Sequence, residues 1–485
     1  MIEFKEVSYT YKGKGNKNAV HDISLTINQG QLVLFCGESG CGKTTLIRLI
    51  NGLVPHYYEG TLTGEVLIDG ETTKDATLPK ISKKVGSVFQ NPRTQFFNVD
   101  TTSELAFGCE NLAMPVDEIE KRIQKVVKEF KIEDLIGRSI FKLSGGEKQK
   151  IACASIAVSD TEIIVLDEPS SNLDIKAINE LKEIISHWKK QGKTIIISEH
   201  RLFYLRELAD KVVFMKNGEI EEVYTGEDFS KFTSKELSQL GLRVTNLNDV
   251  QINTTSIATE NTMLFKNAVY AYAQKLGLNI PNVQIPTGKI VAIIGNNGAG
   301  KTTFARCLCG LLKEKKSVLE MNLKNLSPKE RIQVSYMVMQ DVNHQLFAQS
   351  VLDEVLLGAK TADEELALSF LKELDLIHLK DKHPMSLSGG EKQRLAVAGA
   401  LSCEKELLIF DEPTSGLDLR HMKDVAKILR KLQGKNKTIV LITHDLELIA
   451  DCADFIIRIE KGKVSNQYFL NNDGASQVLN YFTTI

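Results

Sequence analysis

Two glycine-rich loops in this chain carry a residue pattern that binds nucleotide phosphates. The pattern G-x-x-x-x-G-K-T spans residues 37–44 and 295–302, each time after a short apolar run and before a helical pattern. Glycines let backbone N–H groups converge on phosphates, the lysine would reach the β- and γ-phosphates, and the first threonine would offer a hydroxyl to Mg²⁺. Two matches in register leave little room for a chance glycine loop. The residues expected to bind the nucleotide are Gly37, Ser39, Gly40, Gly42, Lys43, Thr44, Thr45, Gly295, Asn297, Gly298, Gly300, Lys301, Thr302 and Thr303, with Thr44 and Thr302 also on the metal.

An Asp-Glu pair follows a four-residue apolar run in each half of the chain. Asp167 and Glu168 follow "IIVL", and Asp411 and Glu412 follow "LLIF". At a strand end, each aspartate is placed to meet Mg²⁺ through its water shell. Each glutamate would point elsewhere and could orient or deprotonate an attacking water. The alternative is a solvated acidic pair without a functional role at a strand terminus. The occurrence of the same apolar run and Asp-Glu pair in both halves argues against this alternative.

Two histidines and two glutamines complete the candidate catalytic set. His200 and His444 end apolar runs 33 positions after their aspartates, and this matched spacing favours a γ-phosphate contact over a purely structural role. Gln90 and Gln340 also follow short apolar runs. Such a side chain can contact Mg²⁺ or the water when its loop moves in, although a glutamine after a strand is usually a surface residue.

The stretch "LSGGEKQ" occurs at 143–149 and again, letter for letter, at 387–393. Ser144 precedes Asp167 by 23 positions, and Ser388 precedes Asp411 by the same number. The chain is therefore one domain duplicated, with 14 extra residues in the first half between its phosphate loop and LSGGEKQ. We expect domains at 1–242 and 263–485, joined by a polar linker at 243–262.

The elements that must position these residues are strands alternating with amphipathic helices. "QLVLFCG" and "KIVAIIG" are apolar runs of strand length, typical of strands buried on both faces. Helical spacing places one apolar face after each Asp-Glu pair. Together these patterns predict an α/β fold with a largely parallel sheet. The predicted apolar helix faces consist of Ile178, Leu181, Ile185 and Trp188 in the first half, and Val425, Ile428, Leu429 and Leu432 in the second.

Length, charge and composition limit the possible partners and the possible location of the protein. The chain has 485 residues and a formal net charge of -2, which gives no reason to expect nucleic-acid binding. No apolar run is long enough to span a bilayer, and the N-terminus lacks the pattern of a signal peptide. Eight cysteines without metal-ligand spacing favour a reducing cytoplasm. If the protein works at a membrane, a partner must hold it there.

The order of phosphate loop, glutamine loop, LSGG signature, Asp-Glu strand end, "SNLD" or "SGLD" and strand-end histidine resembles ATP-binding cassette (ABC) ATPases, twice and over nearly the whole chain. The resemblance implies two tandem ABC-type P-loop ATPase domains that hydrolyse ATP with Mg²⁺. Each would have a mainly parallel sheet with flanking helices, an antiparallel β subdomain and a helical subdomain.

In this family, two ATPase domains pack head-to-tail, and the signature loop of one completes the nucleotide site of the other. The resemblance therefore implies that the second signature covers the ATP on Lys43 and the first covers the ATP on Lys301. It also places Tyr11 and Tyr272 where a side chain stacks on adenine, although a strand tyrosine is by default a packing residue. The signature residues are Ser144, Gly145, Gly146, Ser388, Gly389 and Gly390.

The stretches at 51–70 and 88–115 more narrowly resemble the ATPases of energy-coupling factor (ECF) transporters, which import vitamins and transition metals. This implies integral-membrane subunits contacted through the loops of Gln90 and Gln340, with Gln95 and Gln345 near the receiving groove. It also implies a separate substrate-capture membrane protein and a location at the cytoplasmic face of the cell membrane. The two halves differ within the motifs, where "SEHRL" and "SSNLD" of the first stand against "THDLE" and "TSGLD" of the second, and "QDVNHQ" lacks the Asn-Pro of the first glutamine loop.

Two other functions fit a tandem cassette chain. A ribosome-associated protein acting in translation typically has a longer, highly charged segment between the halves, and 227–261 is neither long nor basic. A DNA-repair ATPase would usually carry a coiled coil or zinc hook, and neither sustained heptads nor suitable cysteine pairs are present. An importer is the function that the sequence favours.

Overall fold

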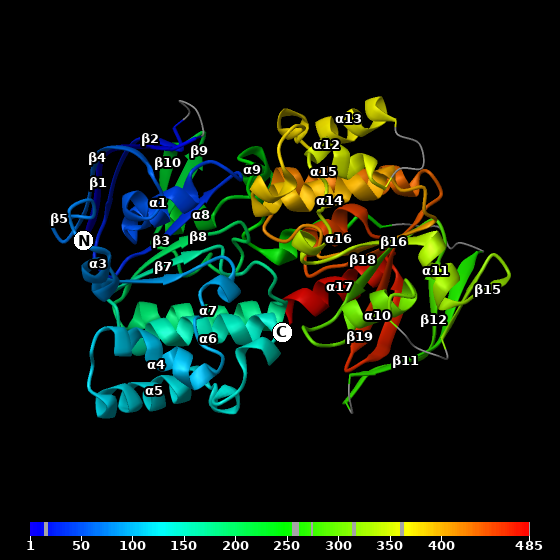
Figure 1. Cartoon of the computed structure of the whole chain (residues 1–485), viewed down its shortest axis with the longest axis horizontal. Helices are drawn as coiled ribbons and strands as arrows, with labels where there is room; N and C mark the ends of the chain where they lie inside the picture. The colour runs from blue at the N-terminus through cyan, green and yellow to red at the C-terminus, as the bar shows by residue number, and fades with distance from the viewer. Residues whose placement is uncertain (14–17, 255–260, 273–274, 313–316, 359–362, 485) are drawn as a thin grey trace. The chain divides into compact units, whose positions relative to one another are not determined.

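The computed structural model describes residues 1–13, 18–254, 261–272, 275–312, 317–358 and 363–484. The chain divides into two compact units, Met1–Asn246 and Leu247–Ile485, and the division falls inside the segment expected to be the linker. The predicted α/β fold is confirmed in both units, each of which contains a mainly parallel sheet, an antiparallel sheet and flanking helices (Figure 1).

The first unit contains two sheets. A four-stranded antiparallel sheet has the order β2-β1-β4-β5, and a six-stranded sheet has the order β10-β9-β3-β8-β7-β6. All neighbours in the larger sheet are parallel except β10 and β9. The strands are β1 (Ile2–Tyr11), β2 (Val20–Ile27), β3 (Leu32–Gly37), β4 (Gly60–Ile68), β5 (Glu71–Thr72), β6 (Val85–Val88), β7 (Ile163–Asp167), β8 (Thr194–Ser198), β9 (Lys211–Lys216) and β10 (Glu219–Thr225).

The larger sheet is covered on both faces, which explains why its strands are continuously apolar. Successive side chains of β3 alternate between two cores. Leu32 and Leu34 pack with the helices α5, α6 and α7, whereas Val33 and Phe35 pack with α1 and the antiparallel sheet. The helices of this unit are α1 (Lys43–Ile50), α2 (Leu53–His56), α3 (Leu78–Lys84), α4 (Thr101–Asn111), α5 (Val116–Phe130), α6 (Gly145–Ser159), α7 (Ile175–Lys190), α8 (Gly226–Ser230) and α9 (Ser234–Gln239).

The second unit repeats both sheets, with the orders β12-β11-β14-β15 and β16-β17-β18-β13-β19-β20. Its strands are β11 (Thr262–Tyr272), β12 (Lys275–Pro286), β13 (Ile290–Ile294), β14 (Val318–Met321), β15 (Lys324–Leu326), β16 (Ser335–Val338), β17 (Leu407–Asp411), β18 (Thr438–Ile442), β19 (Phe455–Glu460) and β20 (Lys463–Phe469). Its helices are α10 (Lys301–Leu308), α11 (Pro328–Val334), α12 (Val351–Leu356), α13 (Glu364–Glu373), α14 (Gly389–Ser402), α15 (Leu419–Gln433), α16 (Leu446–Cys452) and α17 (Asn472–Thr483).

The two predicted apolar helix faces lie on α7 and α15, and all eight of their residues are buried. The extra residues of the first unit lengthen existing elements. Strand β4 has nine residues against four in β14, and helix α5 has fifteen against ten in α13. Within the described residues, no helix combines the length and apolar character needed to cross a lipid bilayer.

Candidate active site

The first phosphate loop connects β3 to α1 and is shaped by glycines. Gly37 has a φ of 143° and Gly42 has a φ of 105°, in the region that glycine adopts most readily. A Cβ atom on Gly37 would also lie 2.2 Å from the carbonyl oxygen of Met215. The loop curls around the buried Lys43, whose Nζ donates to the carbonyl oxygens of Gly37 and Glu38, each at 2.9 Å.

The second phosphate loop, between β13 and α10, has the same geometry. Gly295 and Gly300 have φ values of 147° and 104°, and Nζ of the buried Lys301 donates to the carbonyl oxygens of Gly295 (2.7 Å) and Asn296 (3.1 Å). In both units the lysine is thus held inside the loop, at the start of a helix, where positive potential favours phosphate. Of the remaining predicted loop residues, Ser39, Gly40 and Gly298 are exposed, and Asn297 is partly buried.

A hydroxyl and a carboxylate meet next to each loop. Oγ1 of Thr44 donates to Oδ1 of Asp167 at 3.1 Å, and Oγ1 of Thr302 donates to Oδ2 of Asp411 at 2.8 Å. Ser198 donates a further hydrogen bond to Asp167. Burial raises the pKa of both aspartates, and the charge of the neighbouring glutamate adds to this effect at Asp167.

This pair of hard oxygen atoms fits Mg²⁺, which uses one or two protein oxygens and takes its other ligands from phosphates and water. Among the described residues, no group of three or more His, Cys, Asp or Glu side chains forms an all-protein metal site. A bound Mg²⁺ would bring positive charge close to the phosphates. It would also offset the free-energy cost of burying the negative charge of the aspartate.

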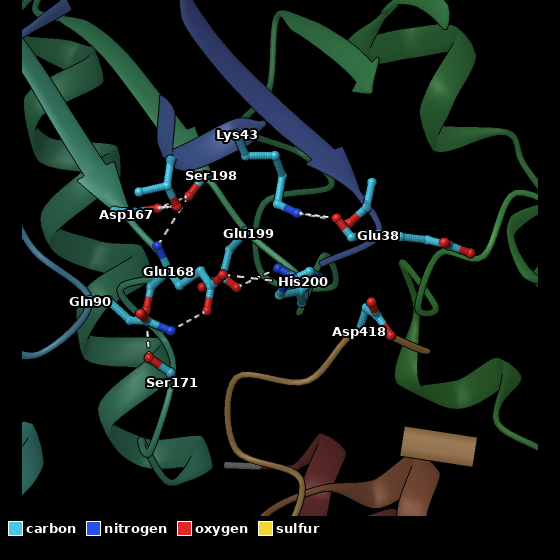
Figure 2. A network of polar contacts seen from close by, with 12 residues as sticks. Glu38, Lys43, Gln90, Asp167, Glu168, Ser171, Ser198, Glu199, His200 and Asp418 are labelled. Carbon is cyan, nitrogen blue, oxygen red and sulfur yellow. Dashed lines mark hydrogen bonds and ion pairs between the residues drawn. The ribbon is translucent and has the colours of Figure 1, made fainter. Parts of the chain in front are cut away.

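Glu168 follows Asp167 and has a φ of 45°, an uncommon conformation for a residue with a side chain and one that clusters at functional sites. Its carboxylate is held on both oxygens (Figure 2). Nε2 of His200 lies 3.3 Å from Oε1, and Nε2 of Gln90 donates to Oε2 at 2.6 Å. Burial raises the pKa of Glu168, but His200, Lys43 and Gln90 together outweigh burial and the net shift is downward. The carboxylate is therefore held in a fixed orientation, and its lowered pKa favours the ionised form, which is able to accept a proton.

Glu412 repeats this conformation in the second unit, with a φ of 54°. Nε2 of His444 lies 3.5 Å from Oε1 of Glu412, and the backbone N–H of His444 donates to Oε2 at 3.3 Å. Nε2 of His444 also lies 3.1 Å from Oδ1 of Asn297 in the phosphate loop. Gln340 is exposed just beyond the end of β16. His444, Glu412 and the phosphate loop therefore meet in the second unit.

Both signature serines are helix caps. Ser144 caps α6 and accepts a hydrogen bond from the backbone N–H of Glu147, and Ser388 caps α14 in the same way. Gly145 and Gly389 are exposed at the helix starts, and Gly146 and Gly390 follow them. The serines thus have a local structural role whether or not they contact a nucleotide.

The two tyrosines expected at adenine are anchored to their phosphate-loop helices. The hydroxyl of Tyr11 lies 3.3 Å from Oγ1 of Thr45 and accepts a hydrogen bond from Arg48 at 3.0 Å. The hydroxyl of Tyr272 lies 3.1 Å from Oγ1 of Thr303, and Tyr272 is 50% exposed. Each ring therefore stands beside its loop.

The second glutamine of each loop points inward. Oε1 of Gln95 accepts the backbone N–H of Phe89 at 3.2 Å, and its Nε2 donates to the carbonyl oxygen of Ser87 at 3.1 Å. Oε1 of Gln345 likewise accepts the N–H of Met339 at 2.7 Å. These side chains fasten the glutamine loop to its strand.

Two buried glutamates also hold these loops, and the sequence analysis missed them. Oε2 of Glu104 accepts the backbone N–H groups of Phe97 (3.1 Å) and Asn98 (2.9 Å), and Oε2 of Glu354 accepts the N–H of Phe347 at 2.8 Å. Each glutamate stands seven positions after its phenylalanine, so comparing the two repeats beyond the known motifs would have found them.

Comparison with known proteins gives one family. The family model described as "ABC transporter" matches residues 20–171 and 278–415. A protein of Treponema denticola described as an ABC transporter ATP-binding protein is 47% identical, and the alignment covers 96% of each chain. One of Clostridium perfringens, similarly described, is 33% identical over 96% of this chain and 89% of its own.

Two solved structures share the tandem fold. A structure titled "Model of ribosome-bound archaeal Pelota and ABCE1" matches with a TM-score of 0.72 and 22% identity, covering 98% of this chain and 80% of the other. One titled "RNase-L Inhibitor" matches with a TM-score of 0.68 and 21% identity, covering 99% and 93%. At this identity the likeness concerns the fold alone.

Proposed function

The chain belongs to the ABC transporter family, and we propose that it is the ATP-hydrolysing subunit of an ECF-type importer that acts on separate membrane proteins. The family binds ATP with Mg²⁺ and hydrolyses it to ADP and phosphate. The cargo under this proposal is a vitamin, a vitamin precursor or a transition-metal ion, and a separate capture protein selects it. The chain would work at the cytoplasmic face of the cell membrane.

The observation that carries the transport proposal is an apolar surface beside the first glutamine loop. We call Phe97, Val99, Phe107 and Phe141 the first apolar patch. Phe97, Val99 and Phe141 are between 64% and 78% exposed, and the ring of Phe97 stacks on that of Phe107 with centroids 5.1 Å apart. The two segments are joined where the N–H of Ile140 donates to the carbonyl oxygen of Val99 at 2.9 Å.

The second unit exposes apolar side chains at matching positions. The second apolar patch consists of Phe347, Leu357 and Met385, which are 75%, 68% and 49% exposed. Clusters of large exposed apolar side chains often mark surfaces that bind another protein. Because such side chains recur beside both glutamine loops, they support two corresponding docking places. A partner with two apolar cytoplasmic segments fits such a pair. Phosphate-rich RNA would instead call for clustered lysine and arginine.

The proposed roles in hydrolysis follow from the geometry of each unit. Lys43 binds the β- and γ-phosphates through its ammonium group, and Glu168 accepts a proton from the water that attacks the γ-phosphate. His200 orients Glu168 and would contact the γ-phosphate of bound ATP. We assign the same three roles in the second unit to Lys301, Glu412 and His444. The signature glycines would approach the γ-phosphate bound to the other half, as the family resemblance implies.

Capture of the tagged full chain from native cells, in mild detergent and ATP-free buffer, tests this function. We expect a stoichiometric polytopic membrane protein, and we expect the double variant Phe97→Ser/Phe141→Ser to lose it while retaining ATP binding. Val116→Ser is the matched control, because Val116 is 68% exposed at the start of α5 but lies outside the patch. Capture of ribosomal proteins in place of membrane proteins would overturn the importer in favour of a role in translation.

A smaller second membrane protein in the capture tests the narrower ECF proposal. Such a protein would be the candidate for cargo selection, and its identity would separate vitamin from metal uptake. If a membrane partner co-purifies without a capture protein from cells that are taking up the cargo, the importer proposal stands but the ECF-type proposal is wrong.

A further inference from the structure

A buried carboxylate stands next to the strand-end histidine in both units, but on opposite sides of it. In the first unit Glu199 precedes His200, and in the second Asp445 follows His444. Both carboxylates are at most 4% exposed. A buried charge of this kind needs several hydrogen-bond donors, and its donors show what it organises.

Glu199 accepts four hydrogen bonds. Its Oε1 takes the backbone N–H of Ser170 at 3.0 Å and the hydroxyl of Tyr204 at 2.9 Å. Its Oε2 takes the backbone N–H groups of His200 at 2.7 Å and Arg201 at 3.1 Å. The carboxylate thus joins the segment after Glu168 to the segment that carries the histidine, and Figure 2 shows it beside both.

Asp445 makes the corresponding connection from the other side. Its Oδ2 accepts the hydroxyl of Thr414 at 3.0 Å, and its Oδ1 accepts the backbone N–H of Leu448 at 3.3 Å as the cap of α16. Ser170 and Thr414 occupy the same place in the repeat, three positions after the strand-end aspartate. A carboxylate before or after the histidine therefore reaches the same turn.

The different position of the carboxylate in the two units changes which group accepts the backbone N–H of the histidine. In the first unit this group donates to Glu199, whereas in the second His444 donates it to Oε2 of Glu412. In the first unit, Oε2 of Glu168 accepts a hydrogen bond from Nε2 of Gln90.

We propose that Glu199 is a positioning residue of the first site, which takes up the N–H of His200 so that Oε2 of Glu168 remains with Gln90. Asp445 is its counterpart in the second unit and anchors the turn after Glu412. This inference rests on the proposed assignment of Glu168 and His200 to ATP hydrolysis. Glu199 acts through its neighbours and touches no nucleotide in this scheme.

The test compares Glu199→Gln with a swap that installs the second arrangement. A glutamine keeps the size of the side chain, but its NH₂ group must face either the N–H groups of His200 and Arg201 or the N–H of Ser170. One end of the connection is then lost in either orientation, so His200 shifts. In a chain that also carries Glu412→Gln, so that only the first site keeps its proposed proton acceptor, we expect kcat for ATP to fall on the order of tenfold, with KM within threefold, because small displacements at a reacting centre are costly. The triple variant Glu199→Thr/Arg201→Asp/Tyr204→Leu copies Thr443, Asp445 and Leu448 and should recover most of the lost kcat.

Two further variants make the outcome unambiguous. Glu412→Gln removes the proposed proton acceptor of the second unit, so turnover in this background reports the first site, and Glu168→Gln added to it is the reference: if that reference retains turnover, the proposed function fails at its catalytic residues. If the reference abolishes turnover and Glu199→Gln stays within twofold of the Glu412→Gln parent, only the positioning role fails. A Glu199→Gln protein that melts earlier, and that the triple variant does not rescue, would show a merely structural carboxylate and would also overturn the proposal.

Discussion

Nε2 of Gln90 donates a hydrogen bond to Oε2 of Glu168 across 2.6 Å. Gln90 lies seven positions before Phe97, which belongs to the first apolar patch, so one loop contacts the proposed proton acceptor and carries the proposed docking surface. Gln95 fastens the backbone just before Gln90, and Glu104 fastens the backbone at Phe97. A partner that displaces the loop would therefore change the surroundings of Glu168 directly.

Replacing Gln90 by glutamate tests this connection. A second carboxylate at hydrogen-bond distance repels Glu168, and the loop then withdraws or the two groups share a proton. In a purified chain that also carries Glu412→Gln, so that only the first proton acceptor remains, we expect ATP turnover to fall at least about tenfold, measured as phosphate release. Asn91→Asp is the matched control, because it adds the same charge one residue away and keeps the oxygen that accepts the N–H of Arg93. Equal losses in both variants would show that the contact with Glu168 is not the cause.

The double variant Glu168→Gln/Glu412→Gln tests the proton acceptors themselves. Glutamine preserves the size of both side chains but cannot accept a proton, so turnover should fall at least about a hundredfold while ATP binding persists. Phosphate release and binding of a fluorescent ATP analogue measure the two properties separately. Glu183→Gln, an exposed position on α7, should behave like the wild type. Turnover near the wild-type rate in the double variant would defeat the assignment.

Much of the fold could be predicted because the repeated motifs fix where strands end and helices begin. The apolar runs before Gly37 and Asp167 had to be buried strands, and helical spacing predicted the buried faces of α7 and α15. The approach of Thr44 to Asp167 follows from neighbouring motifs at the ends of parallel strands, even though 123 positions separate them.

The supporting contacts could not be predicted from the motifs, because they depend on which way a side chain turns. The hydrogen bonds of Gln95 to the backbone of Phe89 and Ser87 could not be foreseen from its place after Gln90. Glu104 and Glu199 are ordinary polar residues in the sequence, and only the fold buries them against backbone N–H groups. The positive φ of Glu168 likewise has no signature in residue type.

The first glycine of each signature can be tested without disturbing its helix. A Cβ atom on Gly145 would meet only the carbonyl oxygen of Asn172, at 3.9 Å, and one on Gly389 would meet no described atom within 4 Å. We therefore expect Gly145→Ala and Gly389→Ala to keep the free energy of unfolding within about 0.5 kcal/mol. Turnover should still fall at least about tenfold, because the added methyl group blocks the close approach of a γ-phosphate.

Lys142→Ala, at an exposed position just before the signature, is the control for the glycine variants. Chemical denaturation reports stability, and phosphate release reports turnover. Normal turnover in both glycine variants would mean that no ligand approaches these backbones closely, and the serines would then remain only as helix caps.

Glu147 makes the stability of the first signature helix dependent on pH. Burial raises the pKa of Glu147, but hydrogen bonds from Ser144 and the charge of Arg138 outweigh burial and lower it overall. A lowered pKa in the folded state contributes stability above the ordinary glutamate value, near 4.5, and this contribution disappears as the pH falls through the folded value. Glu147→Gln should therefore cost roughly 0.5–1 kcal/mol at neutral pH and nothing in strong acid. Denaturant titrations of both proteins across the acid range measure this difference, with Glu183→Gln as control. A cost that stays constant below pH 4 would assign the effect to packing instead of charge.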